Sequence, residues 1–446
     1  MRVWPLLSGV SGYDRAIARS TRRRSVTLRL THKLLAGAVM LACAGLAQAA
    51  TLTISCGTVG QDYDSCKRLT DEWARKTGNT VQLLSIPNSS TEILDLYKKM
   101  FASHAADVDV VIVDAVWPAQ IGEHLLDLKE AASDEVKKHF PALIQNNTVH
   151  ERLVALPWFA DVGLLYYRKD LLDKYQQPVP KTWEEFTHAA RVVQEGERQG
   201  GRADFSGYVW EGKAYEGLTC NALEWVHSDG GGTFVDNTTG QISIDVAKTG
   251  GAFDRAAQWV GTISPKTVLG FGEEEARSVF QNGNAAFMRN WHYVWDLLQG
   301  ADSRVKDKVG VALLPAGEAG QSATLGGWQL GVSKYSRHQK QATELVMYLT
   351  SEKIQKRRAI EGAYMPTYPA LYRDSEVKAS SPFFGELHDV LEKAVPRPAA
   401  ITAARYNAVS ASIWDAAHEV LKGQTRGEEA AKKLKDDLSR LKGEQW

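Results

Sequence analysis

Short runs of β-branched residues alternate along the chain with stretches in which apolar side chains recur at helical spacing. Residues 51–56, 80–86 and 107–115 (TLTISC, TVQLLSI and DVDVVIVDA) each predict a β-strand. Residues 66–76 and 90–102 repeat apolar side chains every three or four positions, which predicts two helices between these strands. This order, with a near-continuous apolar third strand, is typical of a doubly wound α/β lobe with a parallel sheet.

A second group of elements follows. Strands are predicted over residues 162–168, 204–210, 240–244, 284–290 and 308–315. Thr182 and Glu185 form a capping-box pattern that predicts a helix start. Residues 272–283 predict a helix with acids in its first turn, and the chain beyond Gln339 is mainly helical. The glycine-rich residues 323–334 are expected to cross back to the first group, so no single boundary separates the two.

The length of 446 residues exceeds what one ordinary core organises, so we expect two lobes. Ligands of doubly wound lobes bind beyond the carboxyl ends of the strands. This rule places residues 57–64 and 114–118 at a candidate ligand site. Asp114 ends a buried strand, where an acid is costly unless it has a purpose or a partner.

Charge is unevenly distributed along the chain. Residues 1–50 hold eight basic residues and one acid, so residues 51–446 carry a net charge near −7 although the whole chain is neutral. An acidic body argues against non-specific nucleic-acid binding. Residues 34–46 are an apolar run too short to span a bilayer, followed by the A-x-A cleavage pattern Ala47–Ala49. We therefore expect residues 1–50 to be a signal peptide and the mature chain to be exported; a lipid anchor on Cys43 fits poorly.

Three cysteines, Cys56, Cys66 and Cys220, follow the expected signal peptide. In an oxidising compartment Cys56 and Cys66 could close a small loop, but three free thiols fit the pattern equally well. No C-x-x-C pattern is present, so neither zinc nor thiol redox chemistry is indicated. We expect no metal and no cofactor.

No clear catalytic motif is present. Residues 207–214 (GYVWEGKA) nearly match a phosphate-binding loop, but Ala214 replaces the hydroxyl that would hold magnesium. Asp114 and Asp161 could be the acid and base of an exported glycoside hydrolase, or they could bond sugar hydroxyls without chemistry. We predict no catalytic residue.

Twelve tryptophans follow residue 50, which is a high number. Those at helical spacing are predicted to be core: Trp73, Trp183, Trp225, Trp259 and Trp414. Others occupy turn-like or strand-end positions: Trp117, Trp158, Trp210, Trp291, Trp295 and Trp328. Aromatic faces beside acids and an arginine suit a sugar, whose C–H face stacks while its hydroxyls form hydrogen bonds. They could equally hold a cationic ligand by cation–π attraction.

Six segments carry a family resemblance: residues 156–172, 181–186, 207–220, 280–295, 324–336 and 394–398. With them the chain resembles the solute-binding proteins of ABC importers, in the sugar-binding class of the maltose-binding type, and within that class trehalose/maltose-binding proteins. The resemblance implies a two-lobe α/β periplasmic binding protein fold of type II, with doubly wound lobes joined by three crossing segments. It implies one lobe from residues 51–158 and 328–375, and another from residues 160–327 and 376–446.

The resemblance also implies which residues bind the ligand: Asp62, Asp64, Asp114, Asp161, Trp291, Tyr293, Gly326, Gly327, Trp328 and Arg397. The acids and Arg397 would bond sugar hydroxyls, Trp291 and Tyr293 would stack on a sugar ring, and the glycines would offer backbone contacts. Asp62 and Asp64 compete for one position of the family pattern. The cysteines of the first loop, and the lack of a basic residue over 90–94, depart from that pattern and leave the exact sugar open.

The implied function is that of a binding component of an ABC sugar importer, not an enzyme. It would hold a disaccharide such as trehalose or maltose by hinge closure and, as a monomer, deliver it to a membrane permease served by a cytoplasmic ATPase. Alternative ligands are another glucoside, a polyamine or a glycerophosphodiester. A phosphodiester calls for several cations where the sequence offers mainly Arg397, and a polyamine leaves Arg397 unexplained.

Overall fold

The computed structural model describes residues 49–446 apart from 57–59, 88 and 381–383. Residues 50–446 form one compact unit. The predicted signal peptide, residues 1–50, lies almost wholly outside the described residues and stays a prediction.

One half of this unit is built on a five-stranded sheet in the order β2-β1-β3-β13-β6. Its strands are β1 (Thr51–Ile54), β2 (Thr80–Leu83), β3 (Val110–Asp114), β6 (Leu156–Val162) and β13 (Leu325–Val332). The first three are mutually parallel, as the alternating pattern predicts, because helices make the connections between them. Strand β13 runs antiparallel to both of its neighbours.

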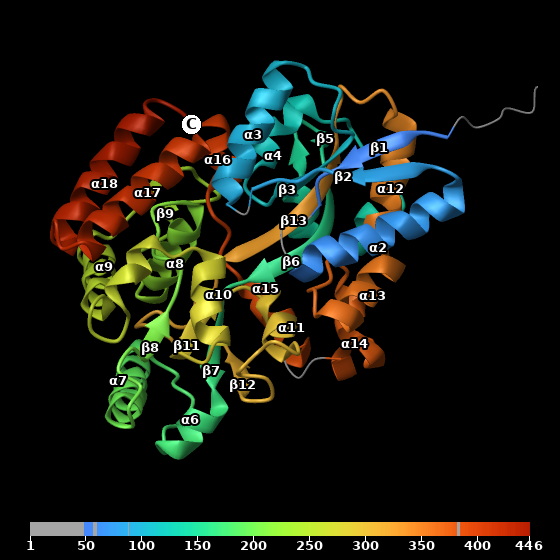
Figure 1. Ribbon diagram of the computed structural model, residues 1–446. Coiled ribbons are helices and arrows are strands. Elements are labelled where there is room, and N and C mark those ends of the chain that lie inside the picture. Colours follow the sequence, from blue (N-terminus) through green and yellow to red (C-terminus); the bar gives the residue numbers. More distant parts are fainter. Residues whose placement is uncertain (1–48, 57–59, 88, 381–383) are drawn as a thin grey trace, which may run out of the picture. The chain divides into compact units, whose positions relative to one another are not determined.

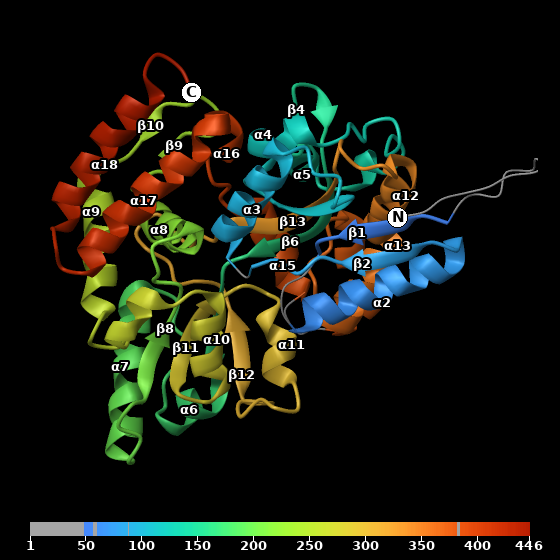
Figure 2. The ribbon, with the colours of Figure 1, turned by 45° about the horizontal axis from the view of Figure 1, so that its top comes forward.

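The other half contains a four-stranded sheet in the order β12-β7-β11-β8. Its strands are β7 (Leu164–Arg168), β8 (Ser206–Val209), β11 (Ala285–Asn290) and β12 (Val309–Ala312). Strand β11 is parallel to β8 and antiparallel to β7. In Figures 1 and 2 the two sheets lie in different parts of the unit, each with its own helices.

Helices cover both sheets. They include α2 (Gly60–Thr77), α3 (Ser90–Ala102), α4 (Pro118–Ile121), α5 (Pro141–Asn146), α12 (Gln339–Thr350), α13 (Glu352–Gly362), α14 (Ser375–Ser380) and α15 (Phe384–Lys393). The remainder are α6 (Lys169–Lys174), α7 (Trp183–Gln199), α8 (Glu216–Ser228), α9 (Val246–Trp259), α10 (Glu273–Gln281), α11 (Val294–Gln299), α16 (Ala399–Thr402), α17 (Tyr406–Leu421) and α18 (Gly427–Lys442). The described residues also form the two-residue strands β4 (Thr148–Val149), β5 (Arg152–Leu153), β9 (Phe234–Val235) and β10 (Ile242–Ser243), and several short 3-10 helices.

The chain passes between the two halves at three places. Strand β6 ends at Val162, and β7 begins one residue after Gly163. The second passage leads from β12 into β13, and the third leads from α15 toward α16. The second and third run side by side, because Leu325 donates its backbone N–H to the Val395 carbonyl at 2.9 Å. The lobe boundaries proposed from the sequence stay a prediction.

Most of the tryptophans pack in the interior. All of the following are 3% exposed or less: Trp73, Trp117, Trp158, Trp183, Trp210, Trp225 and Trp259. The four of these at helical spacing are core residues, as predicted. Trp117, Trp158 and Trp210 are core residues too, so their strand-end positions do not make them ligand contacts.

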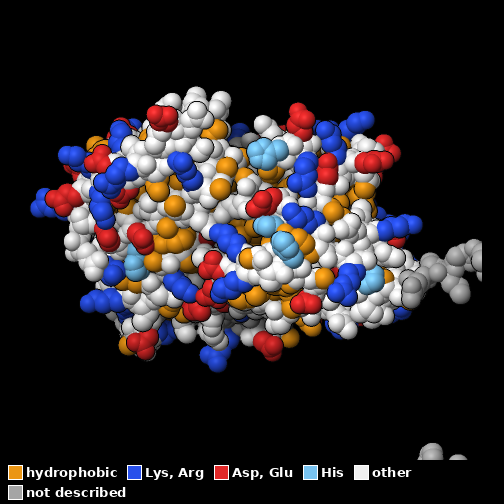
Figure 3. Space-filling model, turned by 90° about the horizontal axis from the view of Figure 1, so that it is seen from above, with side chains coloured by type: hydrophobic (Ala, Val, Ile, Leu, Met, Phe, Trp, Pro, Cys, Tyr) orange, Lys and Arg blue, Asp and Glu red, His pale blue; other side chains and the backbone are white. Residues whose placement is uncertain are grey.

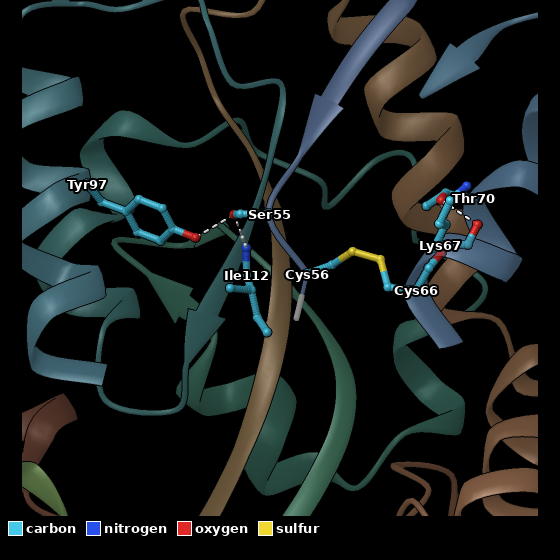
Figure 4. Close-up of a disulfide and its surroundings, with 7 residues drawn as sticks. All are labelled: Ser55, Cys56, Cys66, Lys67, Thr70, Tyr97 and Ile112. Atoms are coloured by element: carbon cyan, nitrogen blue, oxygen red, sulfur yellow. Dashed lines mark hydrogen bonds between the residues drawn. A yellow bond between two sulfur atoms is a disulfide. The ribbon is translucent and has the colours of Figure 1, made fainter. Parts of the chain in front are cut away.

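A disulfide joins the end of β1 to α2, and Figure 4 shows it beside the Ser55–Tyr97 hydrogen bond. Its cysteines, Cys56 and Cys66, are buried, and their Cα atoms lie 6.2 Å apart. The sequence left this pairing open, and the structure settles it. Cys220 is a buried free thiol.

We expect replacement of Cys66 by serine to lower the free energy of unfolding by about 3 kcal/mol, because opening a loop of this size increases the entropy of the unfolded chain. Urea unfolding of oxidised residues 51–446 measures this change. Cys220→Ala, which removes a thiol without a cross-link, is the control. A Cys66→Ser chain that unfolds at the same urea concentration as the natural one would contradict the expectation.

Candidate ligand-binding site

A cavity of about 370 Å³ is lined by residues of both halves, a volume within the range of small-molecule sites. Eight of the ten residues predicted to bind ligand line it: Asp114, Asp161, Trp291, Tyr293, Gly326, Gly327, Trp328 and Arg397. They come from distant parts of the sequence, and the two sheets and three passages bring them together. Whether they contact a ligand stays a prediction at this point.

The two competing aspartates of the first loop have different outcomes. Asp64 is exposed on α2 and lines a separate surface hollow beside Lys67 and Arg68, not the cavity. The structure therefore places Asp64 away from the predicted site. The side chain of Asp62 lies outside the described residues.

Arg397 connects acids from both halves. Its Nη1 donates to Glu216 Oε1 at 2.7 Å, at the start of α8, and its Nη2 donates to Asp114 Oδ1 at 3.3 Å, at the end of β3. Burial raises the pKa of Asp114 to about 6, against the opposing effect of the Arg397 charge. Glu216 also accepts hydrogen bonds from Tyr406 and Ser410. The Arg397 Nε is buried and has no hydrogen-bond partner among the described residues.

Asp161 lies near the end of β6 and is held by the segment after β11. Its Oδ1 accepts the backbone N–H groups of Val162 and His292 at 2.9 and 3.1 Å. The Nδ1 of His292 lies 2.7 Å from the same oxygen. These three contacts all use the Oδ1 oxygen of the Asp161 carboxylate.

The aromatic residues after β11 alternate in direction. His292 is fully buried, while Trp291 and Tyr293 on either side are half-buried and line the cavity. The backbone here is a turn between β11 and α11, and it brings Trp291 and Tyr293 to the same cavity while His292 points into the interior. Tyr293 donates its hydroxyl to Glu274 Oε1 at 2.7 Å. Trp295, which the sequence placed with the turn-like positions, packs against an apolar cluster and does not line the cavity.

Strand β13 places backbone against these aromatics. A Cβ on Gly326 would lie 3.0 Å from Cζ3 of Trp291, so the ring packs directly on the strand. Gly327 has a φ of +123°, and a Cβ there would lie 2.6 Å from the Phe159 carbonyl oxygen. The next residue, Trp328, packs edge-on against the buried Trp117. At Gly326 and Gly327 the strand therefore has little space for a side chain.

The cavity also holds residues that sequence reasoning did not select: Glu92, Lys213, Tyr215, Glu216, Glu273, Glu274 and Glu275. Three of them form the first turn of α10, which the sequence marked only as a helix start. Tyr215 donates its hydroxyl to Glu273 Oε2 at 2.5 Å. The acidic first turn of α10 was the feature of the sequence that could have indicated these residues. Only the fold shows that this turn faces the cavity.

Comparison with known proteins identifies this arrangement. Residues 58–356 match the model of the family described as bacterial extracellular solute-binding protein. The chain is also 49% identical over 411 residues to a probable ABC transporter-binding protein of Deinococcus radiodurans, covering 92% of this chain and 97% of that one. This chain belongs to the bacterial extracellular solute-binding protein family.

Solved structures agree with this assignment. The solute-binding protein matches maltose-bound MalE3 of T. maritima with a TM-score of 0.83 and 38% identity, over 88% of this chain and 100% of that one. It shares its fold with the GacH receptor of Streptomyces glaucescens at a TM-score of 0.78 and 24% identity, over 88% and 98% of the two chains. The predicted two-lobe α/β fold is thereby confirmed.

It follows that the solute-binding protein is the substrate-binding component of an ABC transporter and not an enzyme. Its partners are the membrane permease and the ATPase of such a transporter. Among the helices in the described part of the chain, none has the length and apolarity to cross a bilayer. On the face seen in Figure 3, acidic and basic side chains are interspersed and form no single basic stripe.

Proposed function

We propose that this solute-binding protein takes a disaccharide such as maltose or trehalose into the cavity between its lobes. The observation that carries the proposal is the convergence in one cavity of the acids Asp114 and Asp161, the aromatic pair Trp291 and Tyr293, and Arg397. Carboxylates and arginine satisfy the hydroxyls of a sugar, and aromatic faces cover its C–H surface. The likeness to a maltose-bound relative supports the same class of ligand.

In this proposal the lobes close by bending at the three passages, and the permease receives the closed form. Asp161, whose contacts within the described residues use Oδ1, forms hydrogen bonds with ligand hydroxyls through Oδ2, and Arg397 also bonds ligand hydroxyls. Residues 1–50 direct the chain to the periplasm, where it acts as a monomer.

A polyamine is the second candidate, because the cavity lining is rich in acids. Seven carboxylates, including the three of the first turn of α10, line it together with two basic residues, Lys213 and Arg397. Aromatic faces and carboxylates together would suit an ammonium ligand. A glycerophosphodiester is disfavoured, because Arg397 already pairs with both Asp114 and Glu216.

Thermal unfolding of residues 51–446 in a panel of ligands tests the proposal, because a ligand that binds the folded state raises its melting temperature. The panel contains maltose, trehalose, cellobiose, spermidine and glycerophosphocholine. The proposal expects a rise with at least one glucose disaccharide and none with spermidine. A rise with spermidine alone would replace the disaccharide by a polyamine.

Replacement of Trp291 by alanine is expected to weaken sugar binding by at least about 1 kcal/mol, because the ring supplies a stacking face and buried area. Isothermal titration with the sugar selected by the panel measures the change. Trp414→Ala is the matched control, since Trp414 packs against the apolar core that contains Trp225 and Trp259 and does not line the cavity. Unchanged affinity in a folded Trp291→Ala chain would refute the stacking role.

Sugar affinity is expected to fall as the pH drops through about 6, because burial raises the pKa of Asp114 from 3.8 to about 6. A ligand hydroxyl that donates to the Asp114 carboxylate favours the ionised form, so binding must release a proton at low pH. The raised pKa changes the stability of the ligand-free protein in the opposite direction. The contribution of Asp114 to the free energy of unfolding is greatest below pH 3.8 and is lost as the pH rises through about 6.

Titration calorimetry at about pH 5 and about pH 7.5 tests this expectation, and the dissociation constant should rise about tenfold at the lower pH. Asp114→Asn, which cannot titrate at this position, should flatten the profile. Affinity that is equal at both pH values in the natural chain would contradict a role for the ionised Asp114.

A further inference from the structure

A buried cluster of charged side chains lies next to Trp291, on the side of the ring that is turned away from the cavity. Arg289, on β11, is 0% exposed and forms a two-pronged pair with Glu224 of α8, with Nε–Oε2 and Nη2–Oε1 distances of 3.0 and 2.5 Å. Its Nη1 donates to Glu211 Oε1 at 3.3 Å, and Asn221 donates to the other Glu211 oxygen at 2.7 Å. Glu224 and Glu211 do not line the cavity. Such a cluster is expensive to bury and is weak evidence for stability, which invites another explanation.

The cluster touches the ring proposed to stack on the ligand. The Arg289 guanidinium carbon lies 4.0 Å from the centroid of the Trp291 ring, in stacking contact. The edge of that ring packs on Gly326, in the second passage. A planar guanidinium held at three nitrogens by carboxylates fixes the plane of a ring that stacks on it, which a flexible ammonium cannot do.

The same cluster touches two passages between the lobes. Glu224 Oε1 accepts the backbone N–H of Thr324 at 3.2 Å, one residue before β13. A Cβ on Gly163, between β6 and β7, would lie 2.0 Å from Glu224 Oε1 and 2.6 Å from Arg289 Nη2. Glycine at this point lets the first passage lie directly against the ion pair. The orientation of the Trp291 ring is therefore tied to the segments at which the lobes would bend.

We propose that Arg289 is a positioning residue that fixes the Trp291 ring for ligand stacking, with the Arg289–Glu224 pair anchoring that ring to the first two passages. The inference rests on the proposed ligand contact of Trp291 and deepens it. Arg289 does not line the cavity, so it acts on the ligand only through Trp291. Its effect on affinity must therefore disappear when the ring is absent.

A double-mutant cycle tests this dependence. Arg289→Lys keeps a positive charge beside the two glutamates but removes the planar stacking face. We expect it to weaken sugar binding about fivefold in the natural chain and less than about twofold in a Trp291→Ala background. Equal weakening in both backgrounds would overturn the inference. Arg168→Lys is the matched control: the buried Arg168 ends the neighbouring strand β7 and pairs with Asp170 of α6, so its replacement should leave affinity unchanged.

Glu224→Gln is tested in the same double-mutant cycle. This change keeps the side-chain volume and leaves the Glu211 carboxylate to balance the Arg289 charge. It provides the test if the Arg289→Lys chain does not fold. A ligand-free readout separates the two proposals. The near-ultraviolet circular dichroism of Arg289→Lys should differ from that of the natural chain, and this difference should vanish in a Trp291→Phe background. If Trp291→Ala alone leaves affinity unchanged, the stacking role fails; if the spectral difference persists without Trp291, the positioning role fails.

Discussion

Replacement of Arg397 by methionine is expected to lower the free energy of unfolding by about 3–5 kcal/mol and to abolish measurable sugar binding. Arg397 is 6% exposed and neutralises two buried carboxylates, those of Asp114 and Glu216. Methionine fills a similar length but leaves both acids without their charge partner, which is the costly way to break a buried ion pair. Urea unfolding and calorimetric titration of residues 51–446 measure the two effects.

Two variants complete this test. Arg191→Met, at an exposed position on α7, should leave both quantities unchanged. Adding Asp114→Asn and Glu216→Gln to Arg397→Met should recover part of the lost stability, because the stranded charges are then gone. An Arg397→Met chain as stable as the Arg191→Met chain would show that the three side chains are not coupled as described.

Replacement of Gly327 by alanine is expected to cost about 4 kcal/mol of stability, from strain and collision together. The φ of +123° is a conformation that side chains rarely adopt, and the new Cβ would lie 2.6 Å from the Phe159 carbonyl oxygen and 2.9 Å from the Ala160 Cα. Both obstacles are backbone atoms, so they cannot move aside without shifting β6. Chemical unfolding measures the loss.

Gly320 provides the matched control for this variant. Its φ of +110° is similar, but a Cβ there would meet nothing within 4 Å. Gly320→Ala therefore isolates the strain, and we expect it to cost about 1–3 kcal/mol and to leave sugar binding intact. Equal losses for the two glycines would mean that the close approach of β6 to Gly327 contributes nothing.

Elements with clear periodicity were predictable from the sequence. The helix over residues 90–102 has the predicted bounds, with Ile93, Leu94, Tyr97 and Phe101 buried on one face. Strand β6 was not predicted, because Pro157 interrupts a run that is buried on both faces. Helix α8 was not predicted as an element either, since nearly all of its residues are buried and it lacks the polar face that reveals a helix.

The site residues that match the family pattern were predictable from the sequence. Those brought to the cavity only by the fold were not. The sequence could not bring the glutamates of α10 to Trp291, because their proximity depends on how α10 packs against β11. Asp64 was selected as part of a loop, but α2 begins at Gly60 and turns Cys66, Leu69 and Trp73 inward, which leaves Asp64 on the outer face. The helix begins six residues earlier than predicted, and Asp64 therefore lies on the helix surface and not in the site.

Tryptophan fluorescence of residues 51–446 during titration with maltose, and separately with trehalose, tests the central claim most directly. The account predicts a saturable fluorescence change at micromolar sugar or below, which corresponds to a binding free energy of roughly −8 kcal/mol or better. Most of this change should be lost in the Trp291→Phe chain. No saturable change with any glucose disaccharide up to millimolar concentration would contradict it. The chain would remain an ABC solute-binding protein, but its acid-rich cavity would then have to bind another class of ligand.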